Sequence, residues 1–114
     1  MATNKTYPFS TAKHAHDIEF WRYRVLNEMG DMECGFDSYG NDVPMDKARY
    51  DAMDRAINDP VFLSLLSKVM SGCGRIIWLT GPEIGLAKKI VAWASETRSA
   101  TCIKNGRYDL LKYC

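Results

Sequence analysis

Apolar residues recur at helical spacing through residues 11–29, which predicts a first helix there. Gly30 follows at the position where a glycine commonly ends a helix. The next segment, 31–43, is rich in Gly, Asp, Asn and Ser, and it is predicted to be a loop with a short extended piece at 34–36. Residues 1–10 are polar, contain a proline and are predicted to form a loose arm. The expected inner face of the helix consists of Ala15, Ile18, Trp21, Val25, Leu26 and Met29.

The same spacing predicts two further helices in the amino-terminal half. Pro44 stands at a first-turn position, and helical spacing follows it over 44–58. Asp59 and Pro60 then end this helix and start the next one, 60–71, because aspartate caps a helix start and proline fits its first turn. The expected inner positions are Met45, Ala48, Ala52, Ala56 and Ile57 in the first of these helices, and Phe62, Leu63, Leu65, Leu66, Val69 and Met70 in the second.

The pattern changes at residues 75–79, where apolar residues follow one another without alternation. Such a run is typical of a strand that is covered on both faces. Thr80 and Glu83 come next at capping-box spacing, which predicts a helix that starts immediately after the strand. The expected inner face of this helix consists of Ile84, Ala87, Ile90, Val91 and Ala94.

Two short strands, 100–104 and 107–113, are predicted on either side of Asn105-Gly106, a dipeptide that strongly favours a two-residue hairpin turn. A strand, a helix and another strand in succession favour a right-handed parallel crossover. We therefore expect one domain over residues 1–114, of α+β or small α/β class. Its three amino-terminal helices would be followed by a strand-helix-strand-hairpin unit that forms a small three-stranded mixed sheet.

Charge is divided unevenly along the chain, although the net charge is only +1. Residues 1–67 contain seven Lys and Arg against eleven Asp and Glu, whereas residues 68–114 contain eight against three. The small total excludes a strongly acidic mimic of nucleic acid and a uniformly basic histone-like surface. The four cysteines form no CxxC pair, and no apolar stretch approaches the length of a membrane span. We expect a soluble cytoplasmic protein with reduced thiols.

The basic half predicts a binding surface, since cations interleaved with aromatic side chains suit an acidic protein surface or a single nucleic-acid strand. The alternative is that these charges only solvate half-buried aromatic residues. The predicted binding residues are Arg75, Lys88, Lys89, Arg98, Lys104, Asn105, Arg107, Tyr108 and Lys112.

Reactive chemistry has only weak candidates in this sequence. Cys73 lies in a Gly-Cys-Gly segment beside Arg75, so it is the best candidate for a nucleophilic thiol. His14 and His16 could supply a base, but residues two apart on a helix point in nearly opposite directions and cannot chelate one metal from one face. We therefore predict no metal site and no cofactor.

We expect a non-enzymatic interaction protein, an adaptor or inhibitor that docks on a protein or a protein–nucleic acid complex, in the style of small accessory proteins of viruses and mobile elements. One alternative is direct binding of nucleic acid or a nucleotide by the basic half, without any membrane contact. A second alternative is a small thiol- or metal-dependent enzyme. A homodimer that pairs through an edge strand at 107–113 is a further alternative.

Overall fold

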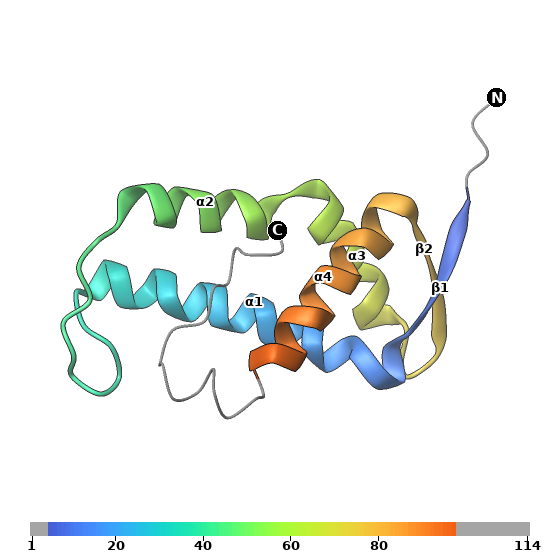
Figure 1. Ribbon diagram of the computed structural model, residues 1–114, viewed down its shortest axis with the longest axis horizontal. Coiled ribbons are helices and arrows are strands. Elements are labelled where there is room, and N and C mark those ends of the chain that lie inside the picture. The colour runs from blue at the N-terminus through green and yellow to red at the C-terminus, as the bar shows by residue number, and fades with distance from the viewer. Residues whose placement is uncertain (1–4, 98–114) are drawn as a thin grey trace.

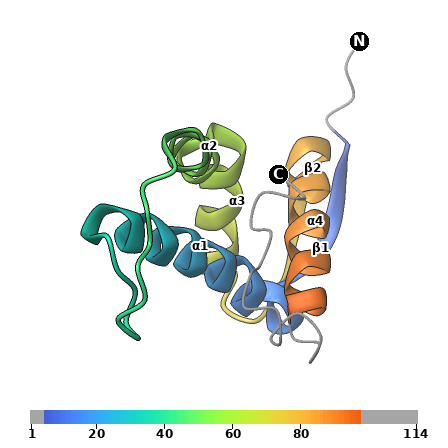
Figure 2. The ribbon, with the colours of Figure 1, turned by 60° about the vertical axis from the view of Figure 1, so that its left-hand side comes forward.

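The computed structural model describes residues 5–97 as four helices and two strands (Figure 1). The elements are β1 (Thr6–Ser10), α1 (Thr11–Cys34), α2 (Lys47–Asn58), α3 (Pro60–Ser71), β2 (Ile76–Thr80) and α4 (Gly81–Thr97). Helices α1 and α2 run side by side, and α4 crosses α1 near the sheet (Figures 1 and 2). The sheet lies at one end of the long axis, and the α1–α2 loop lies at the other (Figure 1).

The predicted three-stranded mixed sheet is wrong, because the described part of the chain contains one two-stranded antiparallel sheet. Residues 6–10, which were predicted to be a loose arm, form β1 and pair with β2. The register sets Thr6 opposite Thr80 and Ser10 opposite Ile76. The predicted strands 100–104 and 107–113 lie outside the described residues. A five-residue strand whose partner is about seventy residues away leaves little local pattern, which explains the error.

Strand β2 is also not covered on both faces. Leu79 is fully buried, whereas Ile76 and Trp78 are 63% and 59% exposed. Helices α1, α3 and α4 contact the sheet, and they all lie on its Leu79 side (Figures 1 and 2). The run of apolar residues therefore has one covered and one open face.

The boundaries of the first helix differ from prediction because burial extends its apolar stripe. Helix α1 continues through Gly30 to Cys34, and Met32 is buried in the added turn. The residue that ends the helix is Gly35, whose φ of 87° is a left-handed conformation suited to glycine. Its backbone N–H donates to the carbonyl oxygen of Asp31 at 2.9 Å.

Helix α3 matches the predicted 60–71, and its cap is the predicted one, because Asp59 accepts a hydrogen bond from the backbone N–H of Val61 at 3.1 Å. Helix α2 starts later than predicted. Its cap is the side chain of Asp46, and Pro44 stays outside the helix. Its one fully buried side chain is Met53, which the predicted inner face did not include.

The core draws on all four helices and both strands. Trp21 of α1 meets Phe62 of α3 edge to face, with ring centroids 4.9 Å apart. Phe9 of β1 and Leu79 of β2, on the inner face of the sheet, pack in the same hydrophobic cluster. The other large side chains that are fully buried among the described residues are Ile18, Val25, Met53, Leu65, Val69 and Ile90.

A tight contact joins the start of α1 to the turn before β2. The backbone N–H and the hydroxyl of Thr11 both donate to the carbonyl oxygen of Arg75. Gly72 packs against the Thr11 side chain so closely that an added Cβ would lie 2.5 Å from Cγ2 of Thr11. Position 72 therefore has no room for a Cβ unless the Thr11 side chain moves.

We expect Gly72→Ala to lower the free energy of unfolding by about 1–3 kcal/mol, because the new methyl group must displace the threonine that holds this junction. The matched control is Gly30→Ala, where a Cβ meets nothing within 4 Å; there alanine should raise the free energy of unfolding by about 0.5–1 kcal/mol. Urea denaturation measures both changes. Equal stability of the two variants would contradict the close contact at Gly72.

Candidate functional site

The open side of the sheet gathers the most exposed apolar side chains of the two strands. Residues directly opposite in an antiparallel pair lie on the same face, so Pro8 and Trp78 are neighbours, as are Ser10 and Ile76. We call this side the outer face. It consists of Thr6, Pro8, Ser10, Ile76, Trp78 and Thr80.

The outer face is an unusual place for a tryptophan in a free chain. Full burial of a large apolar side chain is worth about 1.5–3 kcal/mol, and Trp78 and Ile76 forgo much of this together. The backbone that carries them is held by pairing with β1 and by packing of Leu79 into the core. A partner would therefore meet a preformed apolar surface, and tryptophan is among the residues most enriched at the energetic centres of interfaces.

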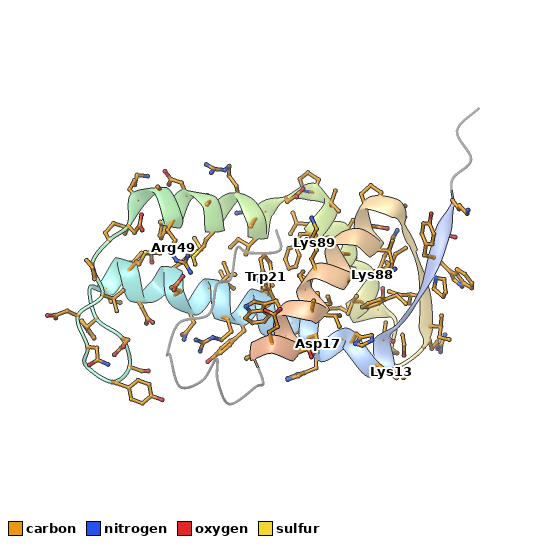
Figure 3. The ribbon with its side chains drawn as sticks, viewed as in Figure 1. Lys13, Asp17, Trp21, Arg49, Lys88 and Lys89 are labelled. Atoms are coloured by element: carbon orange, nitrogen blue, oxygen red, sulfur yellow. The ribbon has the colours of Figure 1, made fainter. Side chains whose placement is uncertain are left out.

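Three cations border the outer face. Lys5 precedes β1, Lys13 lies in the first turn of α1, and Arg75 precedes β2; all three are exposed. Figure 3 shows Lys13 at the sheet end of α1. Residues 5–16 and 70–82 contain these three cations and no Asp or Glu. These two segments, which contain both strands, therefore carry a net positive charge.

The structure separates the predicted basic residues that it describes. Arg75 borders the outer face, whereas Lys88 and Lys89 are exposed on α4, which packs against the other side of the sheet (Figure 3). The remaining predicted residues lie outside the described part of the chain, so the basic surface as a whole stays a prediction. They are Arg98, Lys104, Asn105, Arg107, Tyr108 and Lys112.

In the described part of the chain, the two histidines among the weak catalytic candidates are engaged in local contacts, whereas Cys73 is not. His14 pairs with the buried carboxylate of Asp17, with Nδ1 3.2 Å from Oδ2, and His16 stacks on Phe20. Cys73 is exposed, in a strained backbone conformation with φ at 49°. Among residues 5–97, no hydrogen bond joins this thiol to an imidazole, and no three His, Cys, Asp or Glu side chains are grouped to hold a metal ion.

A buried polar cluster fixes the turn between β2 and α4. The Glu83 carboxylate accepts hydrogen bonds from the backbone N–H and hydroxyl of Thr80, from Nζ of Lys68 at 2.7 Å, and from the hydroxyl of Ser64. Burial opposes its ionisation, but the hydrogen bonds from Lys68, Ser64 and Thr80 outweigh it and lower the pKa of Glu83 from 4.5 to about 2. The Glu83 carboxylate therefore caps the start of α4, as the Thr80–Glu83 spacing predicts.

A groove of about 690 Å³ lies on another part of the surface, where α2 meets α3. Trp21 and Leu86 contribute apolar lining, and polar residues of the α2–α3 turn form the rim. Asn58 and Asp59 on this rim already bond to nearby backbone groups, at 2.8 Å and 3.1 Å. No His or Cys is among the described residues that line the groove.

Sequence patterns did not identify the outer face. Ile76, Ile77, Trp78 and Leu79 are all large and apolar, so no alternation marks which of them face solvent. Only the pairing with β1 and the helices on one side make Trp78 a surface residue.

Comparisons with known proteins assign no relative: no family model, curated protein or solved structure matches this chain. Within residues 5–97, no helix combines the length and the apolar character that crossing a membrane requires.

Tryptophan fluorescence reports on the outer face. Trp78 is 59% exposed, whereas Trp21 and Trp93 are 1% and 3% exposed. Acrylamide should therefore quench one component strongly, and Trp78→Phe should remove that component. Quenching that persists unchanged in Trp78→Phe would show that another tryptophan is the accessible one.

Replacement of Glu83 should change the stability of the protein in a pH-dependent way. Because the folded-state pKa lies below the ordinary value, the carboxylate stabilises the fold above pH 4.5, and this contribution is lost as the pH falls toward 2. Glu83→Gln should cost about 1–3 kcal/mol at pH 7 and should lack this part of the acid sensitivity. Urea denaturation across this pH range tests it, with exposed Glu19→Gln as the control. Identical pH profiles for wild type and Glu83→Gln would contradict the assignment.

Proposed function

We propose that this protein is a non-enzymatic interaction protein, an adaptor or inhibitor, and that a protein partner docks on the outer face of the sheet. The observation that carries this proposal is the joint exposure of Trp78 and Ile76 on a rigid surface that no described helix covers. Apolar side chains held in place lose little conformational entropy on binding, so their burial contributes to affinity.

The chemistry around Trp78 favours a protein over a nucleic acid. Surfaces that bind single strands stack successive bases on several aromatic side chains along a positive groove. Here the neighbours of Trp78 on the outer face are Pro8 and Ile76, which offer no stacking plane. The expected partner segment carries a large apolar side chain and acidic groups that meet Arg75 and the nearby lysines.

The small size of the outer face favours a transient complex. A stable interface buries roughly 800 Å² on each partner, more than the exposed parts of Pro8, Ile76 and Trp78 supply. A cytoplasmic location is part of the proposal, because Cys34 and Cys73 are both exposed and unpaired, as is usual in a reducing compartment.

We expect Trp78→Ala to abolish capture of the partner from lysate of the source cell, because it removes the centre of the outer face. The matched control is Met70→Ala, which truncates an apolar residue of α3 that is 62% exposed. Bound proteins are compared by quantitative mass spectrometry with and without nuclease treatment. Support consists of a protein that binds wild type and Met70→Ala but not Trp78→Ala, whether or not nuclease is present.

Two results would contradict this proposal. Capture that is equal for Trp78→Ala and wild type would exclude the outer face. Capture that disappears after nuclease treatment, together with binding to a single-stranded oligonucleotide that weakens steeply with salt, would favour the nucleic-acid alternative.

A further inference from the structure

The loop at the end of the molecule opposite the sheet presents two aromatic side chains to solvent. Phe36 is 57% exposed and Tyr39 is 89% exposed. The loop, residues 35–46, has a defined backbone: the Asp37 carboxylate accepts hydrogen bonds from the backbone N–H groups of Tyr39 and Asn41, both at 2.9 Å. We call these residues the aromatic loop.

Charge around the aromatic loop is opposite to charge around the sheet. Residues 31–46 contain five acidic residues and no Lys or Arg. The outer face is bordered by Lys5, Lys13 and Arg75 without an acidic residue in the adjoining segments. The two surfaces lie at opposite ends of the longest axis, which is 51 Å long (Figure 1). The loop end is therefore acidic and the sheet end is basic, and each end carries exposed apolar side chains.

We propose that the chain associates with a second copy head to tail, with the aromatic loop of one copy docked on the outer face of the next. This inference rests on the proposed function, because it uses the outer face as a docking surface and names its occupant. Phe36 and Tyr39 supply the apolar groups for Trp78 and Ile76, and the acidic residues of the loop meet the cations around the sheet.

Charge disfavours the two symmetric alternatives. A two-fold contact between outer faces would bring the cations of one copy toward the cations of the other, and a two-fold contact between loops would bring carboxylates toward carboxylates. Like charges across an interface are unfavourable. Only the head-to-tail contact is complementary, and such a contact forms open chains unless its rotation closes a ring.

Two variants that block opposite ends make this arrangement testable. Trp78→Ser blocks the outer face, and Phe36→Ser with Tyr39→Ser blocks the aromatic loop; all three side chains are exposed, so the fold should tolerate both variants. Sedimentation velocity measures association from about 1 µM to about 500 µM, a range that spans weak protein contacts. Circular dichroism confirms that each variant is folded.

We expect wild type to form oligomers whose mass rises with concentration and falls as salt is raised, since charges across the contact are screened. Each variant alone should associate at least about tenfold more weakly, because it lacks an aromatic anchor. An equimolar mixture of the two variants should form a dimer and stop there, because one intact outer face and one intact loop remain. The loop variant retains Trp78, and this tryptophan is covered in the dimer. Acrylamide should therefore quench its fluorescence less in the mixture than in the loop variant alone.

Three outcomes would overturn the head-to-tail contact: a wild-type chain that stays monomeric at every concentration, a variant that associates as strongly as wild type, or a mixture that forms no dimer. None of them touches the proposed function, which depends on Trp78-dependent capture of another protein. Conversely, if the mixed variants form a dimer but no protein is captured from lysate, the head-to-tail contact is supported and the proposal of a separate protein partner is contradicted.

Discussion

The pairing of residues 6–10 with residues 76–80 is the constraint on which the remaining structure depends. Strand β1 runs directly into α1, and β2 runs directly into α4, so one short sheet sets the positions of two helices. Two hydrogen bonds from Thr11 to the Arg75 carbonyl oxygen hold the same junction. A two-stranded sheet is marginal alone, and here Phe9 and Leu79 anchor it in the helical core.

This arrangement leaves a face that has no helix of the described chain upon it. Three helices suffice to cover one side of a two-stranded sheet, and they bury Leu79 while Trp78 and Ile76 stay in contact with solvent. The buried Glu83 cluster fixes the far end of β2 through Lys68 and Ser64 of α3. The exposed tryptophan is thus carried by a backbone that is held at both ends, which is the property that a docking surface requires.

The fold also converts a division of charge along the sequence into a division in space. Acidic residues concentrate in the loop between α1 and α2, and three cations border the sheet at the opposite end. Lys5 and Lys13 belong to the acidic half of the sequence, yet the pairing of β1 with β2 places them at the two ends of the same sheet, Lys13 at the end where Arg75 lies and Lys5 at the other. A molecule of this kind has an oriented electrostatic field that favours end-to-end encounters.

Local chemistry in the sequence determined that four helices form and where α3 and α4 start. Asp59 with Pro60 marks the start of α3, and Glu83 marks the start of α4, because capping involves only residues within one helical turn. The tertiary structure alone decided that residues 6–10 are a strand, that Trp78 faces solvent, and that α1 passes Gly30. Each of these depends on contacts between residues distant in sequence, and strand pairing and burial leave no mark within a short window of residues.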